Sequence, residues 1–306
     1  MTGARLLADG LAFPEGPVEV SDGSVAVVQM AADLVTVVAP DGSRRDLPCG
    51  PGPNGMALAP GGQEVVVCLN GGLGFERQTD GRLHPGLATD PSARGGLALL
   101  DLTTGAVRPL VPCGPGSAVS APNDVVVAPD GTPGAGGCWF TDLGRRFARH
   151  QEHGGISWCG WDGKVVAAAY PRHGRPNGIG LSHDGRTLYV SESQSAQLWA
   201  WDVLGPGRLG APTLLHQFAH PCRLDGLAVL PDGDLVVATL VVGRLTVLSP
   251  RGQELGRVEL DDPFPTNVCL VGRERQDLVV TLGSSGRLVT MASPSRGRQG
   301  LSVLGG

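Results

Sequence analysis

The stretch RPNGIGLSHDGRTLYVSES, residues 175–193, has the pattern of two short strands joined by a tight turn. GIGLS and RTLYVSE fit strands, and His183-Asp184-Gly185 supplies the turn between them. Asn177 stands at the mouth of this apolar hairpin, although asparagine is a poor strand former. An amide at this position does not stabilise the strand that carries it, which suggests that Asn177 has a role outside its own hairpin.

Similar hairpins recur along the chain, each with an apolar strand before a glycine-containing turn. Seven residues before the first member of each turn pair stands an acid or an amide: Glu15, Asn54, Asn123, Asn177 and Asp225. A degenerate sixth copy, TNVCLVGRERQDLVVTL, has Asn267 at the same offset from Glu274. Because strand residues alternate faces, a fixed offset from a turn gives equivalent positions in every unit.

Six such units, spaced by about 40 to 70 residues, predict an all-β fold: a six-bladed β-propeller with four-stranded antiparallel blades around a central channel. The chain, residues 1–306, is expected to form a single domain. Its N-terminal segment 1–20 and its C-terminal strands near 278–290 are expected to complete one blade together. One asparagine alone most often caps a turn by bonding its own backbone. Six residues in phase instead favour a ring of oxygens facing one end of the channel.

Composition narrows the range of partners. The formal net charge is -5 and 17% of residues are charged, which argues against a surface for nucleic acids or anionic membranes. The N-terminus has no apolar segment typical of a signal peptide, and no run approaches a transmembrane span. The seven cysteines are widely spaced without a C-x-x-C motif, so they are expected to be reduced. A cytoplasmic monomer acting on a small molecule is expected.

The repeats resemble the gluconolactonase/regucalcin (SMP-30-like) family of six-bladed β-propellers. The resemblance spans nearly the whole chain and is carried by short segments in the family's order: FPEGPVEV (13–20), APNDVVVAPDG (121–131), WFTD (139–142), RPNGIGLSHDGRTLYVSES (175–193), LDGLAVLPDGDLVVA (224–238) and FPTNVCLVG (264–272). The resemblance implies one divalent cation at the channel mouth, held by Glu15, Asn177 and Asp225. It also implies that Asp225 is the catalytic base.

Other positions are assigned to the substrate. The resemblance implies Asn123 as a further cation ligand or a contact of substrate and water. Asn54 and Asn267 share its phase and are expected to border the cavity. Glu192 follows the hairpin at 175–193 and is either a substrate contact or an exposed residue at a strand end. Carboxylate and amide oxygens suit Ca²⁺ first, with Mg²⁺, Mn²⁺ and Zn²⁺ as alternatives.

The substrate-facing segments depart from the family pattern. Some members have an arginine two residues before the asparagine of P-N-D, where this chain has Ala121. After FTD the chain reads LGRRFARHQEHGG, so Arg145, Arg146, Arg149 and His150 form either a lid that attracts an anionic substrate or an exposed connecting loop. His150 and His153 have the spacing of a second metal site, although such a pair in a polar loop is usually only solvated.

The predicted reaction is hydrolysis of a small lactone, a sugar-acid lactone or a related one, by metal-activated water with Asp225 as base. No G-x-S-x-G elbow is present, so no covalent intermediate is expected. Two alternatives stay open. The same cation could serve an isomerase, cyclase or lyase acting on an oxygen-rich small molecule, or the propeller could be a non-catalytic module that binds a cation or a partner.

Overall fold

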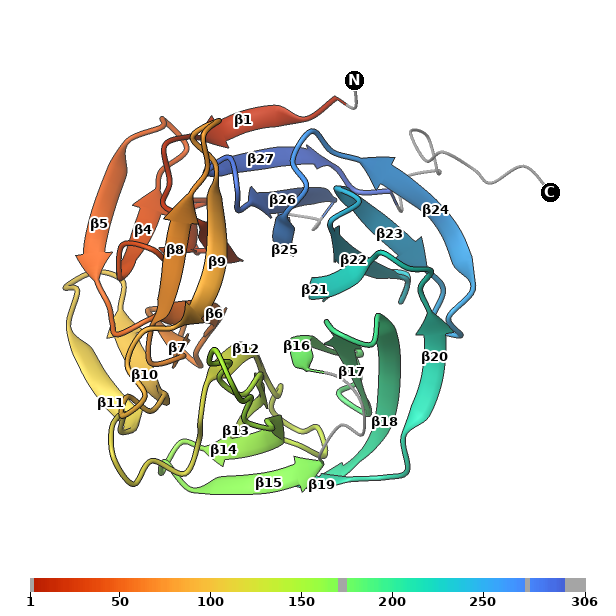
Figure 1. Ribbon diagram of the computed structural model, residues 1–306. Coiled ribbons are helices and arrows are strands. Elements are labelled where there is room, and N and C mark those ends of the chain that lie inside the picture. Colours follow the sequence, from red (N-terminus) through yellow and green to blue (C-terminus); the bar gives the residue numbers. More distant parts are fainter. Residues whose placement is uncertain (1–2, 170–174, 273–275, 295–306) are drawn as a thin grey trace.

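The computed structural model describes residues 3–169, 175–272 and 276–294. Within these ranges the chain forms six antiparallel sheets that surround a central channel as blades (Figure 1). The predicted all-β six-bladed propeller is therefore confirmed. The described residues contain no helix that could cross a bilayer.

Each blade begins with an inner strand beside the channel and continues outward through antiparallel neighbours (Figure 1). From inside to outside, the first blade consists of β2 (Pro14–Glu19), β3 (Val25–Gln29), β4 (Leu34–Val38) and β5 (Arg44–Pro48). The second blade consists of β6 (Pro53–Leu58), β7 (Glu64–Leu69), β10 (Gly96–Asp101) and β11 (Val107–Val111). The third blade consists of β12 (Pro122–Val127), β13 (Gly137–Asp142), β14 (Gly155–Gly160) and β15 (Val165–Ala169).

The other three blades follow the same order. The fourth blade consists of β16 (Pro176–Leu181), β17 (Thr187–Glu192), β18 (Gln197–Gly205) and β20 (Thr213–Gln217), with the short β19 (Arg208–Leu209) also beside β18. The fifth blade consists of β21 (Arg223–Val229), β22 (Leu235–Leu240), β23 (Arg244–Leu248) and β24 (Glu254–Glu259). The sixth blade consists of β25 (Pro265–Val271), β26 (Asp277–Leu282), β27 (Arg287–Ala292) and β1 (Arg5–Ala8).

The sixth blade joins the two ends of the described chain. Its outer strand is β1, which pairs with β27 so that Arg5 lies opposite Thr290. Ala8 and Leu11 are buried in a cluster that this blade shares with the first blade. The N-terminal strand therefore closes the ring by hydrogen bonding and by packing.

The core lies between neighbouring blades. The strands β3 and β22 are buried at every position because both faces of each blade pack against other blades. Val28 of the first blade and Val67 of the second belong to one such cluster, and both are fully buried. Each buried valine contributes on the order of 1.5–3 kcal/mol relative to an exposed one.

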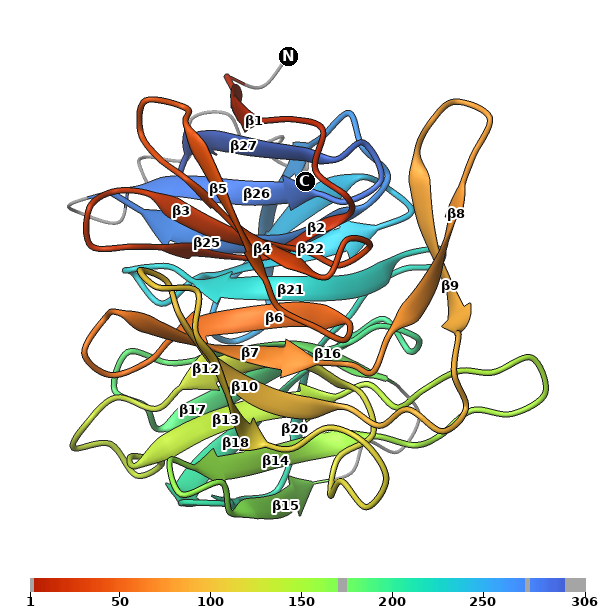
Figure 2. The same cartoon turned by 90° about the vertical axis from the view of Figure 1, so that its left-hand side faces the viewer.

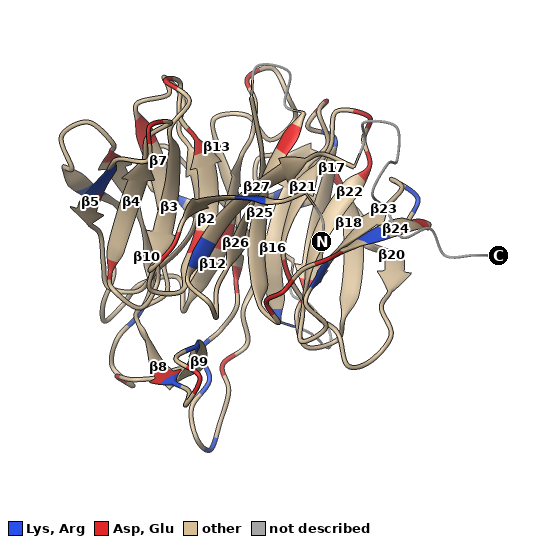
Figure 3. Ribbon diagram, turned by 90° about the horizontal axis from the view of Figure 1, so that it is seen from above, with Lys and Arg blue, Asp and Glu red and all other residues tan. Residues whose placement is uncertain are grey.

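An additional hairpin, β8 (Leu73–Arg77) and β9 (Leu83–Ala88), is inserted between β7 and β10. It projects from one face of the propeller, as Figures 2 and 3 show from two directions. Phe75 packs on Phe13 with ring centroids 5.2 Å apart, and the Ala88 N–H donates to Arg146 O at 3.0 Å. The hairpin therefore stands beside the loop between β13 and β14, and the two form a wall on that face.

Candidate active site

Five of the six repeated polar residues line one pocket at an end of the channel: Glu15, Asn54, Asn123, Asn177 and Asp225. The pocket has a volume of about 200 Å³. All five side chains are buried, with between 3% and 8% of their surface exposed. The structure therefore brings together residues that are far apart in sequence, in agreement with the repeat.

A β-bulge at the start of each inner strand gives these residues their common orientation. In the first blade Glu15 lies opposite Val28 and Val18 lies opposite Ala26, so β2 carries one extra residue between the two pairs. The same irregularity follows the first pair of β6, β12 and β16, and a similar one lies within β21. A bulge of this kind redirects a side chain out of the normal strand alternation.

The sixth blade departs from the predicted ring. On β25 the irregularity falls at Thr266, because Pro265 lies opposite Leu282 and Asn267 lies opposite Thr281. Thr266 thus occupies the place that Glu15 and Asp225 have in their blades. The expectation that Asn267 faces the same end as the other five does not hold, since it lines a second pocket within the channel. Counting seven residues back from a turn failed in this blade because the segment GRERQD contains no Asp-Gly pair that marks the turn.

Asn267 occupies the position that glycine holds in four other blades, and Asp124 occupies it in the third blade. A Cβ added at Gly226 would lie 2.1 Å from Asn267 Cγ, and one added at Gly55 would lie 2.2 Å from Asp124 Oδ1. The glycines therefore leave the space into which the two polar side chains extend. Sequence reasoning missed Asp124, although an acid where most repeats have glycine was a visible signal.

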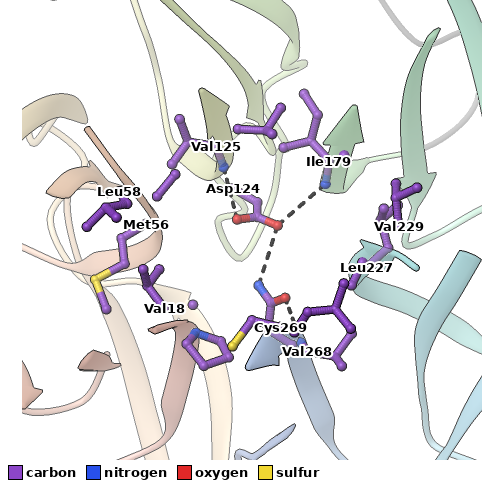
Figure 4. A pocket seen from close by; sticks show the side chains of 18 of the residues that line it. Val18, Met56, Leu58, Asp124, Val125, Ile179, Leu227, Val229, Val268 and Cys269 are labelled. Carbon is purple, nitrogen blue, oxygen red and sulfur yellow. Dashed lines mark hydrogen bonds between the residues drawn. The ribbon is translucent and has the colours of Figure 1, made fainter. Parts of the chain in front are cut away.

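Asp124 and Asn267 both line this second pocket and hydrogen bond to each other. The Asn267 Nδ2 group donates to Asp124 Oδ2 at 3.4 Å and to Glu15 Oε2 at 2.9 Å. Asp124 also accepts from the backbone N–H of Val125 at 2.9 Å and of Ile179 at 3.4 Å. The second pocket, of about 380 Å³, has walls that are mostly apolar (Figure 4). The two side chains thus lie between this pocket and the carboxylate of Glu15.

Three buried carboxyl groups give the site its electrostatic character. Burial raises the pKa of Glu15, and the nearby Asp124 carboxylate raises it further. Burial raises the pKa of Asp124 as well. The pKa of Asp225 lies well above its usual range because of burial, followed by the charges of Glu15 and Asp124. Within the described ranges no Lys or Arg forms an ion pair with any of the three.

The side chains of this site fit a divalent cation. Asn177 Oδ1 is buried and accepts no hydrogen bond, while the Asn177 side chain lowers the pKa of the nearby Asp225 carboxyl. An unpaired amide oxygen and two carboxylates in one pocket suit a cation that prefers oxygen ligands. Across the described residues no three His, Cys, Asp or Glu side chains are grouped as a metal site. A cation here would therefore need the Asn177 amide in addition to the carboxylates.

Hydroxyl groups of neighbouring strands hold the backbone of the site. Thr141 Oγ1 of the third blade donates to Asn177 O of the fourth, and Ser191 Oγ of the fourth donates to Asp225 O of the fifth at 2.6 Å. Thr266 Oγ1 continues the pattern by donating to Pro14 O at 2.7 Å. These bonds fix the spacing between the blades that carry the candidate ligands.

Glu192 is placed differently from the other predicted site residues. Its side chain is only 3% exposed, and its Oε2 accepts a hydrogen bond from Ser195 Oγ at 2.8 Å. It does not line the pocket that contains Glu15 and Asp225. The alternative of an exposed glutamate at a strand end does not describe it either, because Glu192 is buried.

The arginine-rich loop between β13 and β14 has two separate parts. Arg145 is 3% exposed, donates to backbone carbonyls that include Ala93 O, and lies 2.9 Å from Glu152. Hydrogen bonding from Arg145 lowers the pKa of Glu152 to about 2. Arg149 and His150 are exposed, and the His150 ring stacks on Phe147 with centroids 4.4 Å apart. Arg145 therefore fastens the loop to the propeller, and none of these three residues lines the pocket.

Arg146, in contrast, lines the pocket together with Arg175 and Arg223. The Arg175 guanidinium donates to Leu143 O at 3.2 Å and to Gly144 O at 2.5 Å. Burial, followed by the positive charges of Arg146 and Arg223, lowers the pKa of Arg175 to about 10. Sequence reasoning missed Arg175 and Arg223. The available signal was their position two residues before Asn177 and Asp225, the offset at which Ala121 stands in the third blade.

Comparison with known proteins gives consistent matches. The model of the SMP-30/gluconolactonase/LRE-like region matches residues 13–284. A gluconolactonase of Zymomonas mobilis is 24% identical over 311 residues, which covers 92% of this chain and 79% of that protein. A 6-deoxy-6-sulfogluconolactonase of Pseudomonas putida is 31% identical over 113 residues, 36% of this chain and 39% of that protein. The crystal structure of regucalcin from Agrobacterium tumefaciens, described as a calcium-binding protein, shares the fold with a TM-score of 0.73 at 16% identity, covering 95% of this chain and 93% of that chain.

Proposed function

The chain belongs to the SMP-30/gluconolactonase/LRE-like family, and we propose that it is a lactonase that opens a small lactone with the help of one divalent cation. The observation that carries the proposal is the convergence of Glu15, Asn177 and Asp225 on one pocket, where the Asn177 amide oxygen has no hydrogen-bond donor. Ca²⁺ is the first choice, because the ligands are all oxygen atoms.

Glu15, Asn177 and Asp225 would hold the cation. When bound, the cation would polarise the lactone carbonyl and stabilise the negative charge that develops on its oxygen. The Asp225 carboxylate would accept a proton from the attacking water. Asn54 and Asn123 line the same pocket, and their amides would hydrogen bond to hydroxyl groups of the substrate and orient it.

The size of the pocket and the names of the relatives support a small lactone as the substrate. A volume of about 200 Å³ suits a molecule of sugar size rather than a macromolecule. The similar proteins from Zymomonas mobilis and Pseudomonas putida are both named as lactonases of gluconic-acid type.

The test separates cation binding from turnover. Protein stripped with a chelator is titrated with Ca²⁺, Mg²⁺, Mn²⁺ or Zn²⁺ in a calorimeter, and proton release from a panel of γ- and δ-lactones is then followed. We expect one cation per chain and ion-dependent proton release. Asp225→Asn should abolish turnover, and Asn177→Ala should weaken cation binding while the circular dichroism spectrum stays unchanged.

Asp130→Asn is the matched control, because Asp130 is exposed in a turn and lies outside the pocket. It should bind the cation and turn over lactones as the parent protein does. If the cation binds and no lactone is opened, the protein is instead an isomerase, cyclase or lyase, or a non-catalytic module. If no cation binds, the proposal fails at its first step.

A further inference from the structure

Three arginines gather at one side of the candidate active site. Arg146, Arg175 and Arg223 line the pocket of Asp225, and they also line an adjoining cavity of about 170 Å³. The remaining lining of that cavity consists of Leu143, Gln151, Ser193 and Gln194. No acidic side chain belongs to this lining among the described residues. The cavity therefore extends the pocket from its carboxylates toward a positively charged wall.

The positive charges of this wall are not paired within the described part of the protein, although the charge of Asp142 partly offsets that of Arg175. Throughout the described ranges Arg146, Arg175 and Arg223 form no ion pair, whereas other arginines do, for example Arg287 with Asp261 at 2.8 Å. The chain has a formal net charge of -5, and Figure 3 shows acidic and basic residues interspersed over the propeller. A cluster of three unpaired arginines is thus a local feature of this cavity.

The backbone contacts of Arg175 hold the centre of the cluster in place. Its Nε and Nη2 atoms donate to the carbonyls of Leu143 and Gly144, and the residue is only partly exposed. Arg146 lies in the loop that the Arg145–Glu152 ion pair fastens, and Arg223 begins the inner strand β21. Holding three like charges together costs free energy, which an anion bound between them would offset.

We propose that Arg146, Arg175 and Arg223 form a subsite for an anionic group of the substrate, so that the preferred lactone carries a carboxylate, a phosphate or a sulfonate away from its ring. This inference rests on the proposed lactonase function. The ring would lie toward Glu15 and Asp225, and the acid group would lie in the adjoining cavity. Planar guanidinium groups bind the oxygen atoms of all three kinds of acid through paired hydrogen bonds.

The experiment compares charged and neutral ligands in the cation-loaded protein. Gluconate and three analogues that carry a carboxylate, a phosphate or a sulfonate at the terminal carbon are titrated calorimetrically, and kcat/KM is measured for the four corresponding lactones. We expect at least one charged analogue to bind about tenfold or more tightly than gluconate, with the preference weakening as salt rises. The analogue with the largest preference identifies the acid group.

Arg146→Gln and Arg223→Gln remove one charge each from side chains that are exposed and not needed for packing. Each should reduce the preference for the charged ligand several-fold, and the double variant should reduce it further. Arg149→Gln is the matched control, since Arg149 lies in the same loop but lines neither cavity. It should leave the preference unchanged.

The outcomes separate this inference from the proposed function. Cation-dependent opening of neutral and charged lactones at equal kcat/KM, or a preference that survives both arginine substitutions, would overturn the anion subsite and leave the lactonase standing. Preferential binding of a charged analogue without turnover of any lactone would overturn the lactonase and leave the subsite standing.

Discussion

The side chain of Asn267 donates a hydrogen bond from Nδ2 to Glu15 Oε2 at 2.9 Å, across 252 residues of sequence. The same amide group also donates to Asp124 Oδ2. Asn267 therefore holds Glu15, one of the candidate cation ligands, in place. Loss of a residue that orients a metal ligand typically weakens metal binding about 10–100-fold. We therefore expect Asn267→Ala to lower Ca²⁺ affinity by about tenfold or more, as measured by calorimetric titration.

Gln63→Ala serves as the control for this substitution, because Gln63 is exposed in the bend before β7 and does not line the pocket. Its Ca²⁺ affinity should equal that of the parent protein. An Asn267→Ala protein that is folded and binds Ca²⁺ with unchanged affinity would show that Asn267 does not support the Glu15 carboxylate.

The glycine that faces Asn267 should tolerate no side chain. A Cβ at Gly226 would lie 2.1 Å from both Cγ and Oδ1 of Asn267, so Gly226→Ala should destabilise the protein by about 1–3 kcal/mol or more. The free energy of unfolding from urea titration measures this. In the double variant with Asn267→Ala the clash is absent, so the cost of Gly226→Ala should fall substantially.

Gly74→Ala is the matched control, since the nearest atoms to its added Cβ lie 3.4 Å away, an ordinary contact. It should change stability by less than Gly226→Ala does. If Gly226→Ala lowers the free energy of unfolding equally in the parent protein and in the Asn267→Ala variant, the contact with Asn267 is not the reason why position 226 is glycine.

Much of the architecture could be predicted because a hairpin leaves a strong local pattern. The offset between the polar residue and the turn holds where an Asp-Gly or Gly-Gly pair marks the turn, and it led to Glu15, Asn54, Asn123, Asn177 and Asp225. It failed at Asn267, where no such pair gives a reference. In the sixth blade the bulge places Thr266, and not Asn267, at the position equivalent to the pocket residues of the other blades. A bulge depends on how two strands pair, and the sequence of one strand does not show this pairing.

The side walls of the pocket were harder to predict, because they come from loops and from contacts between blades. Arg145 and Arg146 are neighbours in the sequence, yet one is buried against Glu152 and the other lines the pocket. Nothing in the RRFAR pattern separates these two roles. Arg175 and Arg223 join Arg146 only when three blades are assembled around the channel.

The ion pair between Arg145 and Glu152 should make the stability of the loop depend on acid. The pKa of Glu152 is lowered to about 2, below the value of about 4.3 for an unfolded glutamate. The pair therefore contributes fully above about pH 4.3 and loses its contribution as the pH falls toward 2. The difference in urea midpoint between the parent protein and Glu152→Gln should be constant near pH 7 and should shrink between pH 4 and pH 3.

Glu64→Gln is the control for this prediction, because the Glu64–Arg108 pair lies on the surface with 59% of the arginine side chain exposed. Removal of such a pair changes stability by about 0–1 kcal/mol. A Glu152→Gln difference that is equally large at pH 7 and pH 3 would assign the effect to packing rather than to the charge of Glu152.

Deletion of residues 1–12 should open the sixth blade. The deletion removes β1, which is the outer strand beside β27, and it removes the buried side chains of Ala8 and Leu11. Loss of one buried leucine side chain typically costs about 2–5 kcal/mol, so the urea midpoint of the shortened protein should fall clearly. Leu6→Ala is the control, because Leu6 is 50% exposed on the same strand and should change the midpoint little. A shortened protein with the midpoint of the full chain would show that β27 forms a stable outer edge by itself, and that the N-terminal strand does not close the ring.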